Sequence, residues 1–308
     1  MNKYKPINHI KIEKGMSAAE LLEKMQESGV MGAGKLGSAG EILVEMMQDK
    51  ECKIFFGCAG ALVPGGMREI IIDILESGRI DVFVCTGATL THDLVEALGF
   101  HHYQGHHLMD DVKLNEEGYD RMYDSLMPND VYGTIEEFLD KNIEKFTDKK
   151  MNVKEFLWTL GSIVENRSIL KVCAEKKIPI FCPAIGDSGI GLMIWGQLCK
   201  KRNIQVDAFG DLNEIIGISW GSKKNGVLYL SGGTPKNYIQ QAMQFSKGAD
   251  YGIQITTDRP EPGGSSGAPL KEGISWGKLH EKAHFVDVFC DVTIALPLLW
   301  AYAKEKIH

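Results

Sequence analysis

The sequence predicts an α/β fold in which helices flank a central, mostly parallel sheet, arranged as one domain over residues 1–308. Two observations carry this prediction. Short apolar segments alternate with amphipathic segments of helical length along the chain, and this alternation is typical of βαβ units. The 308 residues are 44% hydrophobic, which is enough for a large core without disulfide or metal support.

The first hundred residues contain the clearest helix and strand signals. Ser17 is a good N-cap for the helix that follows it, and Ser77-Gly78 is a good stop signal. The segment Ile80–Cys85 is an apolar run typical of a buried strand. We expect helices over 17–26, 39–47, 65–76 and 91–98, and strands over 53–57 and 80–85.

The same alternation returns in the second half of the chain. We expect helices over 166–176, 190–200 and 235–246, strands over 179–183, 226–230, 251–255 and 284–290, and a last helix that runs to the end. The intervening segment 108–156 is more polar, and we interpret it as a helical excursion from the one domain.

Charge and composition exclude several classes of partner. The net charge of −7 and the absence of a basic block argue against nucleic acid or an anionic membrane surface. The first 15 residues lack the apolar core of a secretory signal, and no apolar stretch is long enough for a membrane span. The seven cysteines are scattered without a CxxC motif, which favours buried thiols in a reducing, cytoplasmic protein.

Five predicted strand ends are followed by small residues. In an open parallel sheet, ligands bind beyond the carboxyl ends of the strands. Small residues there allow a close backbone approach and expose N–H donors at helix N-termini, where phosphate binds well. We therefore expect a nucleotide-like cofactor at these loops, which lie at 57–60, 86–89, 186–189, 231–234 and 256–258.

A literal GxGxxG motif at residues 32–37 is a false signal. The dinucleotide-binding fingerprint has meaning only between a strand and a helix. This copy follows a predicted helix, so we interpret it as a flexible helix–helix connection.

A Gly- and Ser-rich loop at 263–269 precedes the motif Ser275-Trp276-Gly277-Lys278. Such a loop is either mobile or covers a ligand. A lysine in an apolar pocket has a lowered pKa and forms Schiff bases, whereas the alternative for Lys278 is a solvated surface lysine.

Histidines gather between residues 92 and 107. His101, His102, His106 and His107 lie in or near one predicted loop, and His92 follows the end of a predicted strand. The spacing matches no metal-binding signature that we recognise. We therefore expect polar loop histidines and no metal, with His92 facing the ligand cleft.

Several of these motifs resemble the deoxyhypusine synthase family. The similarity runs with nearly collinear spacing from about Gly29 to the C-terminus, and its most specific motif is 275–278. The other matching segments are 55–57 with 68–69, 80–86 with 92–94, 180–187, 231–233 with Lys236, 285–291 and 297–299.

The resemblance implies a Rossmann-like fold, a homotetramer and an enzyme of hypusine biosynthesis. It implies a transferase that uses NAD to oxidise the polyamine spermidine, holds the aminobutyl group as an imine on a lysine, and passes it to a lysine of a small translation factor. By position, Lys278 is the nucleophile and Trp276 a wall of its pocket. The NAD contacts carried over are Thr86, Gly87, Asp187, Gly232, Gly233, Thr257 and Asp291.

The amine pocket departs from the family pattern. His92 and Leu192 replace expected acids, Pro262 and Ser265 replace an Asp pair, and Asn237 replaces a proton-handling histidine. Ala61 and Pro64 replace an expected Asn and Ser, and most of the family's N-terminal extension is missing. Acids that would compensate are Asp93, Glu96, Asp258 and Glu261.

These departures leave two alternatives to a divergent deoxyhypusine synthase. One is a homospermidine synthase-like enzyme that transfers an aminoalkyl group between small polyamines. The other is a non-catalytic, NAD-binding relative, against which the presence of Lys278 argues.

Overall fold

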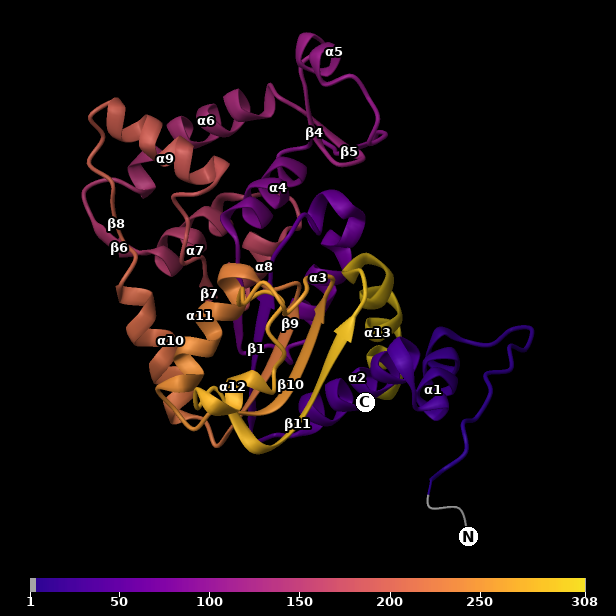
Figure 1. The fold of residues 1–308 in the computed structure, drawn as a ribbon. Coiled ribbons are helices and arrows are strands. Elements are labelled where there is room, and N and C mark those ends of the chain that lie inside the picture. Colours follow the sequence, from indigo (N-terminus) through magenta and orange to yellow (C-terminus); the bar gives the residue numbers. More distant parts are fainter. Residues whose placement is uncertain (1–3, 308) are drawn as a thin grey trace. The chain divides into compact units, whose positions relative to one another are not determined.

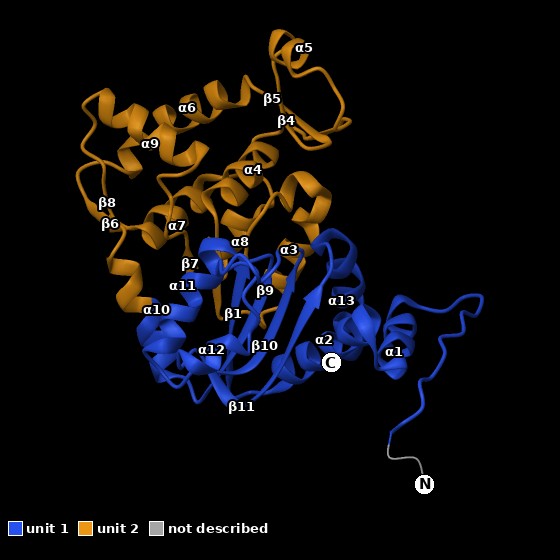
Figure 2. Cartoon of the chain, viewed as in Figure 1, with its two compact units in different colours: residues 1–57, 215–308 blue, residues 58–214 orange. Residues whose placement is uncertain are grey.

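The computed structural model describes residues 4–307, which divide into two compact units (Figure 2). Unit 1 lies within residues 1–57 and 215–308, and unit 2 comprises residues 58–214. The main sheet has six strands: unit 1 provides β11, β10, β9 and β1 in that order, and unit 2 provides β2 beside β7. The single domain predicted from the sequence remains a prediction.

The strands of unit 1 end at a common edge. They are β1 (Cys52–Cys58), β9 (Lys224–Leu230), β10 (Ala249–Thr256) and β11 (Leu279–Phe289) (Figure 1). β10 pairs in parallel with both β9 and β11. Leu230 lies opposite Ile255, and Thr256 lies opposite Phe289. The loops that follow these three strands therefore leave the sheet at one level.

The first and last helices of unit 1 begin at residues that favour helix starts. Ser17 forms a capping box with Glu20 at the first helix, and the Asp291 carboxylate caps the last one. The helices are α1 (Ala18–Ser28), α2 (Met31–Gln48), α11 (Gly233–Gln244), α12 (Glu272–Ser275) and α13 (Val292–Lys306), and α10 (Gly210–Gly221) spans the boundary between the units.

The GxGxxG motif lies inside α2, so the predicted flexible connection was wrong. Its glycines allow α1 and α2 to pack closely. A Cβ on Gly37 would lie 2.3 Å from Cβ of Gln26, and one on Gly34 would lie 2.6 Å from the carbonyl carbon of Gly29. The motif therefore has a packing role and begins no cofactor site.

Unit 2 combines its part of the main sheet with two small sheets. β2 (Val82–Cys85) and β7 (Ile180–Phe181) pair in parallel. β3 (Tyr103–Gln104), β5 (Ser125–Pro128) and β4 (Tyr119–Met122) form an antiparallel sheet in that order. β6 (Lys150–Asn152) pairs in parallel with β8 (Gln205–Asp207).

Helices make up most of the rest of unit 2. A short irregular turn, η1 (Val63–Met67), leads into α3 (Arg68–Glu76), and the 3-10 helix η2 (Ile143–Lys145) follows α6. The other helices are α4 (Gly87–Ala97), α5 (Asp111–Glu116), α6 (Val131–Lys141), α7 (Val153–Ile163), α8 (Ile169–Glu175) and α9 (Gly189–Cys199).

The predicted α/β fold is confirmed, and the elements missed lie mainly in and after the excursion. That segment contains the β4–β5 hairpin as well as helices, and α7 and α10 were not expected. Five of the seven cysteines are buried, Cys290 is half-buried and Cys199 is exposed; all are free thiols. Within residues 4–307, no helix has the length and apolarity needed to cross a membrane.

Candidate active site

Lys278 lies in a small cavity of unit 1. The cavity has a volume of about 180 Å³. Nζ of Lys278 lies 5.0 Å from the ring centroid of Trp276, within the range of a cation–π contact. Trp276 is 56% exposed and Lys278 is half-buried. The lining residues are Gln240, Gly263, Ser265, Ala268, Pro269, Glu272, Gly273, Trp276 and Lys278.

Two residues of this cavity were missed by the sequence analysis. Glu272 begins α12 and brings a carboxylate into the lining. Gln240 lies on α11 one turn after the predicted Asn237, which is half-buried on the same helix. The signal for Glu272 was its position six residues before Lys278, on the same short connection.

The Gly- and Ser-rich loop is held in place by hydrogen bonds. Nζ of Lys236 donates to the carbonyl oxygens of Ser265 and Ala268, at 2.6 Å each. The backbone N–H of Gly233 donates to Oγ of Ser266 at 2.6 Å. Lys236 is only 1% exposed, and burial lowers its pKa to about 8. The loop is thus a fixed wall of the Lys278 cavity.

Gly232 has a packing role at this loop. A Cβ on Gly232 would lie 2.4 Å from Cα of Ser266, so any side chain there would push the loop away. The glycine that was predicted to contact the cofactor is therefore required by the loop itself.

The other cofactor residues predicted in unit 1 lie at the carboxyl edge of its strands. Gly233 begins α11 after β9, exposed Thr257 follows β10, and Asp291 caps α13 after β11. Oγ of Ser266 already accepts from the N–H of Gly233, and Pro235 has no N–H, so the first turn of α11 leaves the N–H of Thr234 to face an anion.

Lys278 lies near the opposite edge of the same strands. It directly precedes β11, and Leu279 pairs with Ala249 at the start of β10, whereas Phe289 pairs with Thr256 at its end. These pairs lie seven residue steps apart along β10, or about 23 Å at ~3.3 Å per residue. The structure therefore does not bring Lys278 together with Thr257 and Asp291 within unit 1.

The predicted cofactor residues of unit 2 do lie together. Thr86 caps α4 and follows β2, and its Oγ1 accepts from the N–H of Thr89 at 3.3 Å. A Cβ on Gly87 would lie 2.4 Å from Cβ of Ser188, the residue after exposed Asp187. The N-termini of α4 and α9 thus meet beyond β2 and β7, as expected for a ligand site of a parallel sheet.

His92 belongs to a hydrogen-bonded group in unit 2. Its Nδ1 lies 2.9 Å from Nε2 of His102, and Nδ1 of His102 lies 2.7 Å from Oε1 of Glu96. Burial, and then the proximity of His102, lower the pKa of His92 to about 4. His92 is therefore uncharged at neutral pH and does not replace a carboxylate as partner for an ammonium group.

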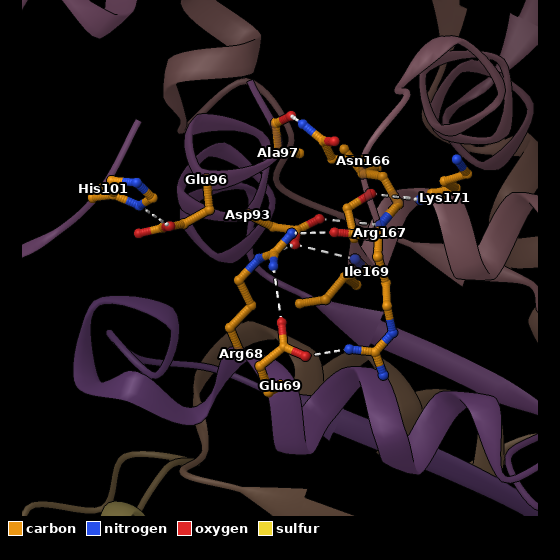
Figure 3. A network of polar contacts seen from close by, with 12 residues as sticks. Arg68, Glu69, Asp93, Glu96, Ala97, His101, Asn166, Arg167, Ile169 and Lys171 are labelled. Atoms are coloured by element: carbon orange, nitrogen blue, oxygen red, sulfur yellow. Dashed lines mark hydrogen bonds and ion pairs between the residues drawn. The ribbon is translucent and has the colours of Figure 1, made fainter. Parts of the chain in front are cut away.

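Two of the acids that were expected to compensate are already engaged (Figure 3). Asp93 is fully buried; it accepts from Nε of Arg68 at 2.9 Å and from the N–H groups of Ile169 and Leu170 at 3.1 Å each. Glu96 is bonded to His102 and His101. Asp258 and Glu261 are exposed, and Glu261 pairs with Arg259.

The histidine-rich segment brings no metal-ligand cluster together in the part of the chain that the structure describes. There, no three His, Cys, Asp or Glu side chains are placed to hold one ion. His106 and His107 contact each other, and His107 stacks on Tyr123.

The fold and these residues define an α/β protein with a lysine-centred cavity and strand-end loops suited to a nucleotide. The sequence profile described as deoxyhypusine synthase matches residues 20–303. The chain therefore belongs to the deoxyhypusine synthase family.

Named relatives span nearly the whole chain. A probable deoxyhypusine synthase 1 of Methanosarcina acetivorans is 43% identical and covers 98% of this chain and 95% of its own. Its counterpart in Archaeoglobus fulgidus is 41% identical, with 96% of both chains covered. The crystal structure of a putative deoxyhypusine synthase from Entamoeba histolytica has a TM-score of 0.68 at 19% identity and covers 98% of this chain and 96% of its own, which supports the fold.

Proposed function

We propose that the protein is an NAD-dependent transferase that moves the aminobutyl group of spermidine, through an imine on Lys278, to a lysine of the hypusine-bearing translation factor. Family membership supports the reaction class. The observation that carries the proposal is the cavity in which Lys278, Trp276 and Glu272 meet.

The cavity suits a small aliphatic amine. Its volume of about 180 Å³ is below the ~300 Å³ at which sites for drug-sized ligands begin. Glu272 provides a carboxylate for a terminal ammonium, and the Trp276 ring provides an apolar face that also attracts cations. Lys278 would hold the four-carbon fragment as an imine until a second amine takes it over.

The strand-end residues fit a dinucleotide. The first turn of α11 offers the N–H of Thr234, and Thr86 and Gly87 lie at the N-terminus of α4; pyrophosphate is favoured at such helix N-termini. The residues that would hold NAD are Thr86, Gly87, Asp187, Gly232, Gly233, Thr257 and Asp291. When bound, NAD would supply hydride acceptance and return.

We further propose a cytoplasmic homotetramer. Lys278 and the strand-end residues lie at opposite edges of β10 and β11. A second copy of the chain that places its own strand-end residues beside Lys278 would complete the site. The half-exposed ring of Trp276 is consistent with such a contact.

The second candidate function is aminoalkyl transfer between small polyamines, as in homospermidine synthases. The uncharged state of His92 and the engagement of Asp93 and Glu96 favour it. These features leave fewer carboxylates for a spermidine trication than the family pattern provides.

The deciding experiment traps the imine. The protein is incubated with NAD and spermidine, reduced with borohydride and digested, and the peptides are weighed. We expect a butylamine adduct on Lys278 that is absent from Lys278→Ala and retained in Lys271→Ala, which removes an exposed lysine of the same connection. NAD binding without an adduct contradicts spermidine as donor, and an adduct formed only from another polyamine supports the second candidate.

A further inference from the structure

The side-chain amide of Gln240 is a free polar group in the Lys278 cavity. Gln240 is half-buried and lines the cavity together with Glu272 and Lys278. A Cβ on buried Gly273 would lie 3.9 Å from Nε2 of Gln240 and 3.5 Å from Cβ of Lys278. The amide and the lysine side chain therefore border the same point of the cavity wall.

The backbone of Gln240 belongs to a helix that is fixed against the loop. Gln240 lies one turn after Lys236 on α11, so the two side chains share one face of that helix. The bonds of Lys236 to the carbonyl oxygens of Ser265 and Ala268 hold this face against the loop. The amide is thus presented to the cavity from a rigid element, as a specific binding group needs to be.

The protein does not use the Gln240 amide to stabilise its own fold. Neither Oε1 nor Nε2 of Gln240 has a hydrogen-bond partner within residues 4–307. Polar groups with a structural role are normally bonded to the chain. A role toward a ligand in the cavity accounts for the amide better than a role in folding does.

An ammonium group in this cavity finds few available acceptors. The carbonyl oxygen of Gly273 already accepts from two backbone N–H groups, and the loop carbonyl oxygens bonded by Lys236 are also engaged. The lining side chains that carry an oxygen acceptor are Gln240, Ser265 and Glu272. A primary ammonium has three N–H donors that point in different directions, so the Glu272 carboxylate alone leaves at least one of them without a partner.

We propose that Gln240 is a specificity-determining residue, whose Oε1 accepts a hydrogen bond from the terminal ammonium of the aminobutyl group beside the carboxylate of Glu272. This inference rests on the proposed function, in which the cavity holds that group on Lys278. The neutral amide adds an acceptor without adding a charge. The site then selects an amine end over an apolar end of the same size, because a site that bonds a substrate N–H rejects the analogue that lacks it.

The test uses two aldehydes and needs no NAD. Aminobutanal and pentanal have chains of equal length that end in an amine and in a methyl group. Each condenses with a lysine amino group to an imine and releases water, and cyanoborohydride then reduces the imine to a stable amine. The protein is treated with an equimolar mixture of the two aldehydes and digested, and the peptides are weighed. Exposed Lys271, on the same connection as Lys278, is the unselective reference within each sample.

The measured quantity is the ratio of aminobutyl to pentyl adduct on each lysine. In the wild type we expect this ratio to be about tenfold higher on Lys278 than on Lys271. Gln240→Leu, with a side chain of similar size and no acceptor, should lower the ratio on Lys278 by about tenfold. Gln240→Glu keeps an acceptor oxygen and should keep the preference. The matched control is Gln244→Leu, which changes an exposed glutamine one turn further along α11 and should behave as the wild type does.

Two results would overturn the inference. One is an equal ratio on Lys278 and Lys271 in the wild type, and the other is a Lys278 ratio that Gln240→Leu leaves unchanged. We expect Gln240→Leu to keep the wild-type urea midpoint, because the amide bonds nothing in the described chain. Should its midpoint fall, Gln240→Ala, which also lacks the acceptor, decides the question in the same way, and a retained preference there overturns the inference.

The trapping experiment with NAD and spermidine separates this inference from the proposed function. Selection between the aldehydes as expected, with no adduct on Lys278 from NAD and spermidine, would contradict the proposed function and leave an amine-selective cavity. An adduct from spermidine on Lys278, with no selection between the aldehydes, would support the proposed function and overturn the role of Gln240.

Discussion

Nζ of Lys236 lies 2.6 Å from the carbonyl oxygen of Ser265, across the loop that forms one wall of the Lys278 cavity. The same ammonium group also donates to the carbonyl oxygen of Ala268. A buried charge normally costs free energy unless it is well hydrogen-bonded. Here the buried lysine is used to fix the loop that shapes the candidate active site.

Replacing this lysine should loosen the loop. Lys236→Met takes the charged donor away from the carbonyl oxygens of Ser265 and Ala268, and a hydrogen bond to a charged group contributes about 1.5–3 kcal/mol. We expect a lower urea midpoint and faster hydrogen exchange over residues 259–271. Lys223→Met, which removes an exposed lysine paired with Glu51, is the control and should change neither. Unchanged exchange in Lys236→Met would show that the loop holds its shape without the lysine.

The fold was predictable where apolar periodicity and helix caps agree. The predicted runs 226–230 and 251–255, which lie within β9 and β10, are apolar except for Gln254, and the capping box at Ser17 marks α1. Helix α7 also has a capping box, from Asn152 and Glu155. It was missed because it begins inside segment 108–156, which we interpreted from its polar composition. The β4–β5 turn was missed because Tyr123 adopts φ 59° without a glycine to signal it.

The candidate site was predictable only where it follows strand ends. Those loops are local features of a parallel sheet, and Thr86 and Gly87 lie where expected. The contact between His92 and His102 depends on the end of α4 and the chain reversal at Gly99, with φ 93°. Tertiary packing of this kind is not encoded in the spacing of the histidines.

Loss of the cavity carboxylate should weaken polyamine binding. Glu272→Gln keeps the size of the side chain but removes the charge that would face the proposed amine, and a hydrogen bond between charged groups contributes about 1.5–3 kcal/mol. We expect at least a tenfold rise in the Kd for spermidine by calorimetry, with NAD affinity unchanged. Glu281→Gln, an exposed acid on β11, should bind spermidine as the wild type does. Equal affinity in both variants would place the amine elsewhere.

The carboxylate of Asp93 should affect stability and not amine binding. Asp93→Ala leaves Arg68 without its buried partner and exposes two N–H groups at the start of α8. Breaking such a pair costs about 3–5 kcal/mol, so we expect a markedly lower urea midpoint and an unchanged spermidine Kd in the folded protein. Asp111→Ala breaks the exposed pair with Arg121 and should leave the midpoint nearly unchanged. A higher spermidine Kd in folded Asp93→Ala would indicate that the Asp93 carboxylate contributes to amine binding.

Acid should destabilise the protein through His92. Its pKa falls from 6.5 to about 4 because the folded protein buries it and places His102 beside it. Between these two values the unfolded chain binds more protons than the folded protein, so this contribution to stability is complete above pH 6.5 and is lost as pH falls toward 4. Urea unfolding of wild type and His92→Gln at pH 7, 6, 5 and 4.5 measures it. We expect the free energy of unfolding of His92→Gln to rise relative to the wild type as pH falls through this window. A constant difference between the two proteins from pH 7 to 4.5 would show that His92 accepts protons as readily in the folded protein as in the unfolded chain.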